Sequence, residues 1–341
     1  MLLEGLFVPL TTPFYSDGRL YLRKLEHNVG RYSKTPAAGM VVLGEAGEAA
    51  LLSEDEARQV LQVALEAAAD EKVLVAGVSR ESVAGTLELA RFAAGLGYDA
   101  VLVEAPRTLG AAQVRERQTY FAAVADGCEL PVVVGSGLPL EDIEILSRHP
   151  RVIGVLEGDA QRIGGIRAAT TEVKRDVVVT PVFAAVTGRM LARRGPAEGG
   201  ARLVSLEALS RGGAAVAVAP ERPAIKTRTK IVGFQVLGRG SAGMLAALEA
   251  GAPGVVPVFA ACAPQACYEV AAAWKDGDAG LAREKQERVE AAVREVEGSA
   301  GGLKYACDLN GYFGGRPRLP LLGSTGEERG RIDAAMRGVR N

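Results

Sequence analysis

The chain has 341 residues, a length that allows two domains or one large barrel with extensions. Its 40 Lys and Arg residues nearly balance its 41 Asp and Glu residues, which excludes the broad basic surface of a general nucleic-acid or anionic-membrane binder. A hydrophobic content of 48% with 42 glycines indicates packed strands and helices joined by turns. Disorder is excluded for most of the chain.

The sequence carries no targeting, membrane or zinc signature. No apolar run reaches the length of a membrane span, and residues 1–5 lack the basic start of a signal peptide, so we expect a cytoplasmic protein without a membrane partner. The four cysteines have no CxxC spacing and only two histidines are present, so we expect neither a zinc site nor a cofactor. We interpret the cysteines as small buried hydrophobic residues.

Short runs rich in Val and Leu alternate with Ala-rich amphipathic stretches, which is the rhythm of a parallel sheet with connecting helices. The predicted strands cover residues 6–13, 39–44, 72–78, 100–105, 131–135, 152–156, 233–238 and 254–259. The predicted helices cover residues 22–33, 54–69, 83–96, 111–126, 140–148, 241–249, 281–296 and 327–336. Ser53, followed by three acidic residues, is a start signal for the second helix because its hydroxyl can cap free backbone amides.

Eight strands with following helices, and no Gly-x-Gly-x-x-Gly after the first strand, favour an α/β fold of the closed (β/α)8 or TIM-barrel type. An open dinucleotide-binding sheet stays an alternative on the pattern alone. We predict the barrel over residues 1–275, with an insertion after strand six at about residues 167–222. The run 176–186 is an alternative seventh strand. Residues 276–341 are expected to form a C-terminal helical extension packed on the barrel.

Motifs in both halves of the chain carry a family resemblance. The first half has Pro9-Leu-Thr-Thr-Pro-Phe14 and Gly44-Glu-Ala-Gly-Glu48, and the second half has Gly302-Leu-Lys304 and Gly311-Tyr-Phe-Gly-Gly315. In order and spacing these motifs resemble the dihydrodipicolinate synthase and N-acetylneuraminate lyase family of class I aldolases. Within that family the tail looks closest to the 4-hydroxy-2-oxoglutarate aldolases.

The resemblance implies a homo-oligomer, a tetramer or dimer, of barrels whose sites lie at the C-terminal strand ends. It also implies a strand-six lysine that forms a Schiff base with a small keto acid. This chain has Leu156 at the lysine position, Gly135 at the position of a proton-relaying tyrosine, and Glu45-Ala46 at the position of paired hydroxyl residues. We therefore predict a lyase-family protein for a small keto acid or related metabolite, without ordinary class I aldolase turnover.

None of the nine lysines falls at the predicted C-terminal end of a barrel strand. Lys72 and Lys230 stand at strand beginnings, and Lys304 belongs to the tail. Lys174 and Lys226 border the insertion, which could fold over the pocket. We interpret all of these as solvated surface charges, with a displaced Schiff-base lysine as the alternative.

The polar and small residues at predicted strand ends are candidates for substrate binding. They are Thr11, Thr12, Gly44, Glu45, Ala46, Glu104, Arg107, Ser136, Glu157, Arg239 and Ser241. The hydroxyls of Thr12 and Ser136 can orient a carbonyl or carboxylate. Arg107 or Arg239 can form a bidentate pair with an acidic substrate, or pair with a neighbouring acid. Glu48 is expected to tie down its loop by accepting backbone N–H bonds.

Two alternatives to a keto-acid lyase stay open. The barrel could be catalytically silent and bind a metabolite or a partner subunit. It could also be a metal-assisted aldolase, in which strand-end carboxylates hold a divalent ion that stabilises an enolate. Those carboxylates are Glu45, Glu104, Glu157 and Asp159. Ordinary rim acids are the plainer interpretation, so no metal is expected.

Overall fold

Eight parallel strands close into a barrel in the computed structural model of this protein, which describes residues 1–110, 112–192 and 225–339. They are β1 (Gly5–Pro9), β2 (Gly39–Val42), β3 (Val73–Gly77), β4 (Ala100–Val103), β5 (Val132–Val134), β6 (Val152–Glu157), β9 (Gln235–Arg239) and β10 (Gly254–Val256). Their order around the barrel is β1-β10-β9-β6-β5-β4-β3-β2. The predicted TIM barrel and its strands are confirmed, and the open sheet is excluded.

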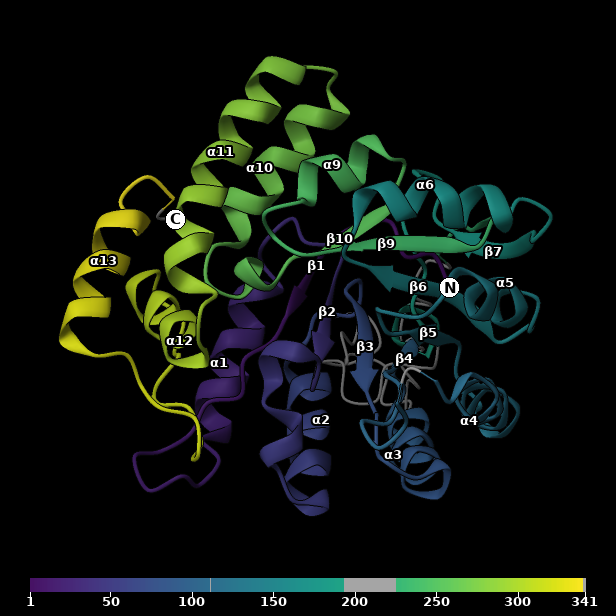
Figure 1. Cartoon of the computed structure of the whole chain (residues 1–341), viewed down its shortest axis with the longest axis horizontal. Helices are drawn as coiled ribbons and strands as arrows, with labels where there is room; N and C mark the ends of the chain where they lie inside the picture. The colour runs from purple at the N-terminus through teal and green to yellow at the C-terminus, as the bar shows by residue number, and fades with distance from the viewer. Residues whose placement is uncertain (111, 193–224, 340–341) are drawn as a thin grey trace, which may run out of the picture.

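Helices surround the barrel, as Figure 1 shows. They are α1 (Leu22–Tyr32), α2 (Glu54–Ala67), α3 (Val83–Leu96), α4 (Val114–Gly127), α5 (Leu140–Ser147), α6 (Ala160–Ala169), α9 (Met244–Glu249) and α10 (Pro264–Lys275). Helix α2 has the predicted cap, because Ser53 and Glu56 each accept the backbone N–H of the other. The sequence prediction lacks α6, because Gly164 and Gly165 weaken its helical pattern. It also lacks α10, although Pro264 is a signal for the start of a helix.

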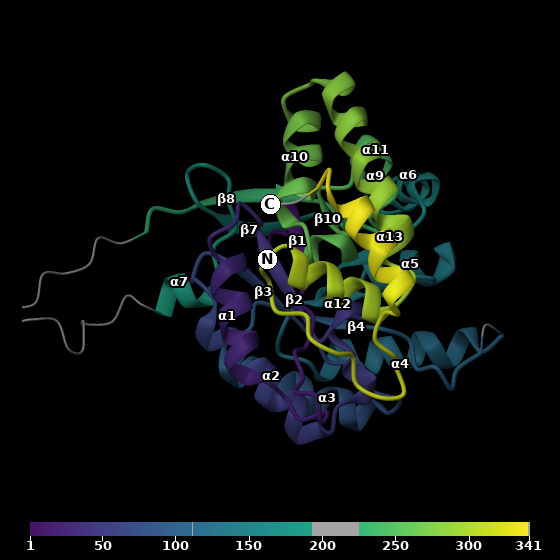
Figure 2. The same ribbon diagram turned by 90° about the vertical axis from the view of Figure 1, so that its left-hand side faces the viewer.

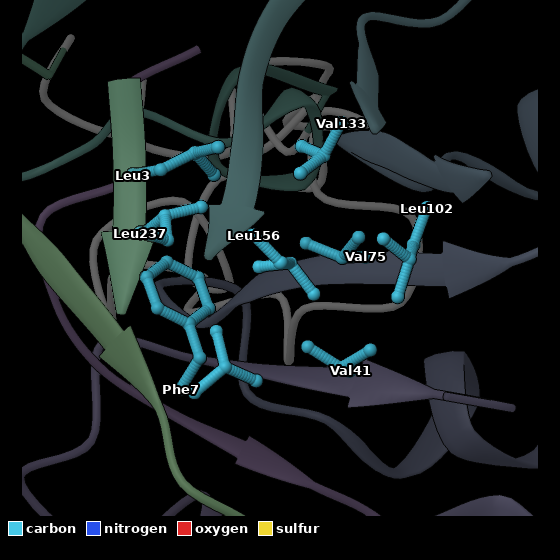
Figure 3. Close-up of a pocket in the computed structure, with 9 residues that line it drawn as sticks. Leu3, Phe7, Val41, Val75, Leu102, Val133, Leu156 and Leu237 are labelled. Carbon is cyan, nitrogen blue, oxygen red and sulfur yellow. The ribbon is translucent and has the colours of Figure 1, made fainter. Parts of the chain in front are cut away.

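Apolar side chains fill the inside of the barrel. Successive side chains of a strand point to opposite faces, so alternate residues of each strand point inward. The inward layer comprises Leu3, Phe7, Val41, Val75, Leu102, Val133, Leu156, Leu237 and Val256, most of which are labelled in Figure 3. They leave a cavity of about 10 Å³, close to the least volume that one water molecule needs. The centre of the barrel therefore has no room for a substrate.

The described part of the insertion packs at the N-terminal end of the barrel. It contains an antiparallel pair, β7 (Arg175–Val179) and β8 (Arg228–Val232), and the short helix α7 (Gly188–Ala192). Val177 packs on Leu2, just before β1, and Arg175 donates a hydrogen bond of 2.9 Å to the carbonyl of Val152 at the start of β6. Figure 2 shows β7, β8 and α7 together on one side of the molecule.

This position excludes residues 176–186 as the seventh barrel strand, because β7 and β8 form a separate two-stranded sheet. The seventh barrel strand is β9, as predicted. Lys174 adjoins β7, so the described part of the insertion carries it to the N-terminal end of the barrel and not over the C-terminal end. Residues 193–222 of the predicted insertion lie outside the described residues.

Helices α11 (Ala279–Val296), α12 (Ala300–Leu309) and α13 (Gly326–Met336) follow the barrel. Their buried side chains, such as Val289 and Ala306, belong to the same hydrophobic cluster as Val8 of β1. The predicted C-terminal helical extension is confirmed, although the sequence prediction lacks α12. The division of the chain at residue 275 stays a prediction.

Lys304 of α12 joins the extension to the barrel through a buried ion pair. Its Nζ contacts the Glu48 carboxylate and donates to the carbonyl of Thr12 at 2.8 Å. Glu48 also accepts the backbone N–H of Arg318 at 2.8 Å, which agrees with its expected role. The expectation of a solvated charge is wrong for Lys304 and for Lys72, because both are buried and protein oxygens replace water around each ammonium group.

The four cysteines are buried and free, which confirms their interpretation as small hydrophobic residues. Within the described ranges, no helix is both long and apolar enough to cross a membrane.

Candidate functional site

A polar layer lies above the apolar layer at the C-terminal end of the barrel. Glu104, Gly135 and Arg239 each follow an inward-facing apolar residue by two positions, so they lie on the same face one layer further along the strand. Glu45 follows β2 and Ser136 follows β5 at the same end. We call Glu45, Glu104, Ser136 and Arg239 the mouth cluster.

Arg239 is held from several sides within the mouth cluster. Its Nε and Nη2 lie 3.0 Å and 2.7 Å from Oε2 of Glu45. Its Nη1 donates to the hydroxyl of Ser136 and lies 3.5 Å from Oε1 of Glu104. The guanidinium group of β9 therefore links residues that follow β2, β4 and β5. Of the two roles predicted for Arg239, the structure contains the pair with a neighbouring acid.

Gly135 makes room for the carboxyl group of Glu104. In the β4–β5 register Val103 pairs with Val134, so the next residues along, Glu104 and Gly135, are neighbours. A Cβ atom at position 135 would lie 1.8 Å from Oε2 of Glu104. No side chain fits at position 135 while Glu104 keeps this position.

The surroundings of Glu104 favour its protonated form. Burial raises the pKa of its carboxyl group, Arg239 lowers the pKa, and the charge of Glu45 raises it again. Two carboxylates face one guanidinium group, so the mouth cluster carries one net negative charge when both acids are ionised. Protonation of Glu104 removes that charge and turns one hydrogen-bond acceptor into a donor.

We expect Gly135→Ala to destabilise the protein by about 1 kcal/mol or less, because the new methyl group displaces only the flexible end of the Glu104 side chain from its place beside Arg239. Urea unfolding measures the loss. The matched control makes the same change in a Glu104→Ala background, where the obstructing carboxyl group is gone. There we expect Gly135→Ala to cost much less stability than it does in the wild type. An equal loss from the alanine in both backgrounds would mean that the methyl group strains the backbone instead.

Glu297, at the end of α11, is a mouth residue that the sequence prediction lacks. Its carboxylate accepts the hydroxyl of Ser241, whose Oγ accepts the backbone N–H of Phe259 at 2.9 Å. Burial raises the pKa of Glu297, the Ser241 hydrogen bond lowers it, and the nearby charge of Glu45 raises it. No local motif marks Glu297, because the packing of the C-terminal extension on the barrel sets its position.

Other predicted candidates lie in the loops around the mouth. These are Thr11, Thr12, Gly44 and Ala46. The hydroxyl of Thr12 donates to the carbonyl of Gly47 at 2.6 Å, and Thr11 and Ala46 are buried. Gly44 precedes the short 3₁₀ turn that presents Glu45. Thr12 therefore holds its loop in place, and the proton of its hydroxyl is already donated to Gly47.

Glu157, Asp159 and Arg107 do not join the mouth cluster. Glu157 follows the outward-facing Val155 by two positions and pairs with Arg162 of α6 at 3.0 Å. Asp159 caps the start of α6, and Arg107 is exposed. In the part of the chain that the structure describes, no three Asp, Glu, His or Cys side chains could hold a metal ion. Of the four carboxylates of the metal-assisted hypothesis, the structure brings only Glu45 and Glu104 together, through Arg239.

Leu156, at the position where the resemblance implies a lysine, lies in the apolar layer directly below the mouth cluster. Its side chain is buried among Phe7, Val133 and Leu237, and Figure 3 shows these side chains converging. An alkyl side chain at this depth supplies neither a nucleophile nor a titratable proton.

The class of protein follows from this architecture. A closed parallel barrel with polar side chains at its C-terminal strand ends is the arrangement of the (β/α)8-barrel enzymes, whose active sites lie at that end. The model of the dihydrodipicolinate synthetase family matches residues 2–179, and the chain belongs to this family. The resemblance found in the sequence is thereby confirmed at the level of the family.

Known proteins resemble the chain along its whole length. The 4-hydroxy-tetrahydrodipicolinate synthase of Cereibacter sphaeroides is 28% identical over 338 residues, which are 98% of each chain. The dihydrodipicolinate synthase DapA-2 of Bacillus anthracis has the same fold, with a TM-score of 0.77 at 18% identity over 100% of each chain. The dihydrodipicolinate synthase of Acinetobacter baumannii, solved in complex with pyruvate, has a TM-score of 0.75 at 20% identity over 99% of each chain.

Proposed function

We propose that this family member binds a small keto acid, or a related metabolite, noncovalently at the mouth cluster and does not cleave it through a Schiff base. The observation that carries the proposal is Leu156. A Schiff base needs a primary amine within reach of the ketone, whereas Leu156 is an alkyl group in an apolar layer. The protein is then a silent barrel of a lyase family, and its role is to bind.

The ligand class is supported by the family and by the donors at the mouth. The neighbour from Acinetobacter baumannii is described in complex with pyruvate. In this chain Arg239 and Ser136 supply the N–H and O–H donors that a carboxylate accepts, and Glu45 holds the guanidinium group in place. The homo-oligomer, the role of a partner subunit and the likeness to 4-hydroxy-2-oxoglutarate aldolases stay predictions.

Incubation with pyruvate and borohydride is expected to leave the intact mass of the protein unchanged. Borohydride reduces an imine to a stable amine, so any Schiff base between pyruvate and a lysine would add a permanent mass. We expect none, because Leu156 has no amine and Lys304 is held in a buried ion pair. A lysine-bearing relative, treated in the same way, must gain the mass of one pyruvyl group for the result to count.

A mass increase that maps to one lysine would overturn this proposal, because it would mean that the nucleophile has moved to another position. Noncovalent binding is measured separately by titration calorimetry with pyruvate. Unchanged mass together with a binding isotherm is the expected pair of results.

A further inference from the structure

The mouth cluster has the wrong charge for an anion when both of its acids are ionised. Glu45 and Glu104 then face the single guanidinium group of Arg239, which leaves one net negative charge where a keto acid would place its carboxylate. Like charges at such short range oppose binding in a partly buried site. A carboxylate is therefore expected to bind more tightly when the cluster loses one negative charge.

One N–H of Arg239 has only a weak partner and can turn to an incoming carboxylate. Nε and Nη2 both serve Glu45, at 3.0 Å and 2.7 Å. Nη1 donates one N–H to the hydroxyl of Ser136, and its other N–H makes only a long contact, 3.5 Å, with Glu104. The second N–H of Nη1 and the O–H of Ser136 thus form a donor pair next to the Glu104 carboxyl group.

Glu104 is the acid whose charge is least compensated. Glu45 has two contacts with Arg239 within 3.0 Å, whereas Glu104 has only the contact of 3.5 Å. The charged groups that act on Glu104 are Arg239 on β9 and Glu45 after β2, both in the mouth cluster, and, with the smallest effect, the exposed Arg107 after β4. Its neighbours after β3 and β5 are neutral. They are Ser79, whose Oγ accepts the backbone N–H of Glu104 at 2.8 Å, and Gly135.

We propose that the mouth cluster binds a small carboxylate with uptake of one proton by Glu104, so that Arg239, Ser136 and the protonated Glu104 all donate hydrogen bonds to the anion. No covalent bond forms or breaks, and solvent supplies the proton. The inference rests on the proposed noncovalent function and adds the charge state in which the site binds. The raised pKa of Glu104 agrees with it, because burial already favours the neutral acid.

The test is titration calorimetry of the full chain with pyruvate between about pH 5 and pH 8, in buffers with different ionisation enthalpies. Proton uptake makes the affinity fall by about tenfold per pH unit above the pKa of Glu104, and level off below it. The buffer dependence of the heat should give close to one proton per ligand on the falling part of the curve. This measurement uses the unmodified protein, so it does not depend on any variant folding.

The variant Glu104→Gln tests whether Glu104 is the residue that takes up the proton when pyruvate binds. The amide is a permanent neutral donor, so we expect this variant to bind pyruvate with an affinity that does not change with pH. Glu116→Gln, on the exposed face of α4, is the matched control and should keep the pH dependence of the wild type. Glu297→Gln tests the other acid at the mouth whose pKa is raised by burial. This variant should also keep the pH dependence of pyruvate binding.

The outcomes separate this inference from the proposed function. Binding without proton uptake, or a pH dependence that Glu104→Gln keeps or Glu297→Gln removes, overturns the role of Glu104 and leaves noncovalent binding intact. A borohydride adduct, or no binding of pyruvate at any pH, overturns the proposed function and the inference with it.

Discussion

Replacement of Lys304 by methionine is expected to lower the free energy of unfolding by about 3–5 kcal/mol, because it leaves the carboxylate of Glu48 buried without a counter-ion. The ammonium group also donates to the carbonyls of Thr12 and Arg316, at 2.8 Å and 3.2 Å. It lies 4.4 Å from the ring centre of Phe14. Methionine has a similar length but supplies none of these interactions. Urea unfolding followed by circular dichroism measures the change.

A surface ion pair gives the matched control. Lys285 lies 2.6 Å from Glu269, with the two side chains 23% and 41% exposed, so Lys285→Met should cost less than about 1 kcal/mol. Glu48→Gln combined with Lys304→Met removes both buried charges, and we expect this double variant to be more stable than Lys304→Met alone. If Lys304→Met and Lys285→Met cost the same, the buried pair does not join the extension to the barrel in the way inferred here.

Periodicity was sufficient to predict the barrel strands, because the strands of a closed parallel barrel are buried on both faces and form short apolar runs. Where two apolar runs compete, as 176–186 and 233–238 do, periodicity does not decide between them. The structure shows why 176–186 is amphipathic and not apolar throughout: Val177 and Val179 are buried, whereas Asp176 and Val178 are exposed. Such alternation is typical of a sheet with one solvated face.

The members of the mouth cluster were predictable as strand-end residues, but their contacts were not. Nothing local relates Arg239 to Glu45, since 194 positions separate them and only barrel closure brings them together. Gly135 and Glu104 are a different case. Their strands are consecutive, so the register of β4 and β5 alone would have predicted that a missing side chain faces an acid. The position of Glu297 depends on how the C-terminal extension packs on the barrel, and no strand register predicts it.

The register also bears on whether a lysine at position 156 would be sufficient for turnover through a Schiff base. We expect Leu156→Lys to leave turnover of a keto-acid substrate about 10²–10⁴-fold below that of a lysine-bearing relative, the range that general acid–base groups contribute. The new amine would lie below the mouth cluster, but position 135 has no side chain to relay protons and the Glu104 carboxyl group occupies its space. An acid, Glu45, also stands where the resemblance implies a hydroxyl.

Two measurements on Leu156→Lys distinguish imine formation by the new lysine from the proton transfers that must follow it. The borohydride mass increase reports whether an imine forms, and the steady-state rate reports whether protons then move. Leu237→Lys, on the neighbouring strand β9 in the same apolar layer, is the matched control for the cost of burying an ammonium group, which lowers the pKa of the new lysine in both variants. We expect Leu156→Lys to form at most an imine, with a steady-state rate that stays about 10²–10⁴-fold below that of the relative. A rate close to that of the relative from this single change would mean that Glu104 or another group at the mouth already performs the proton transfers.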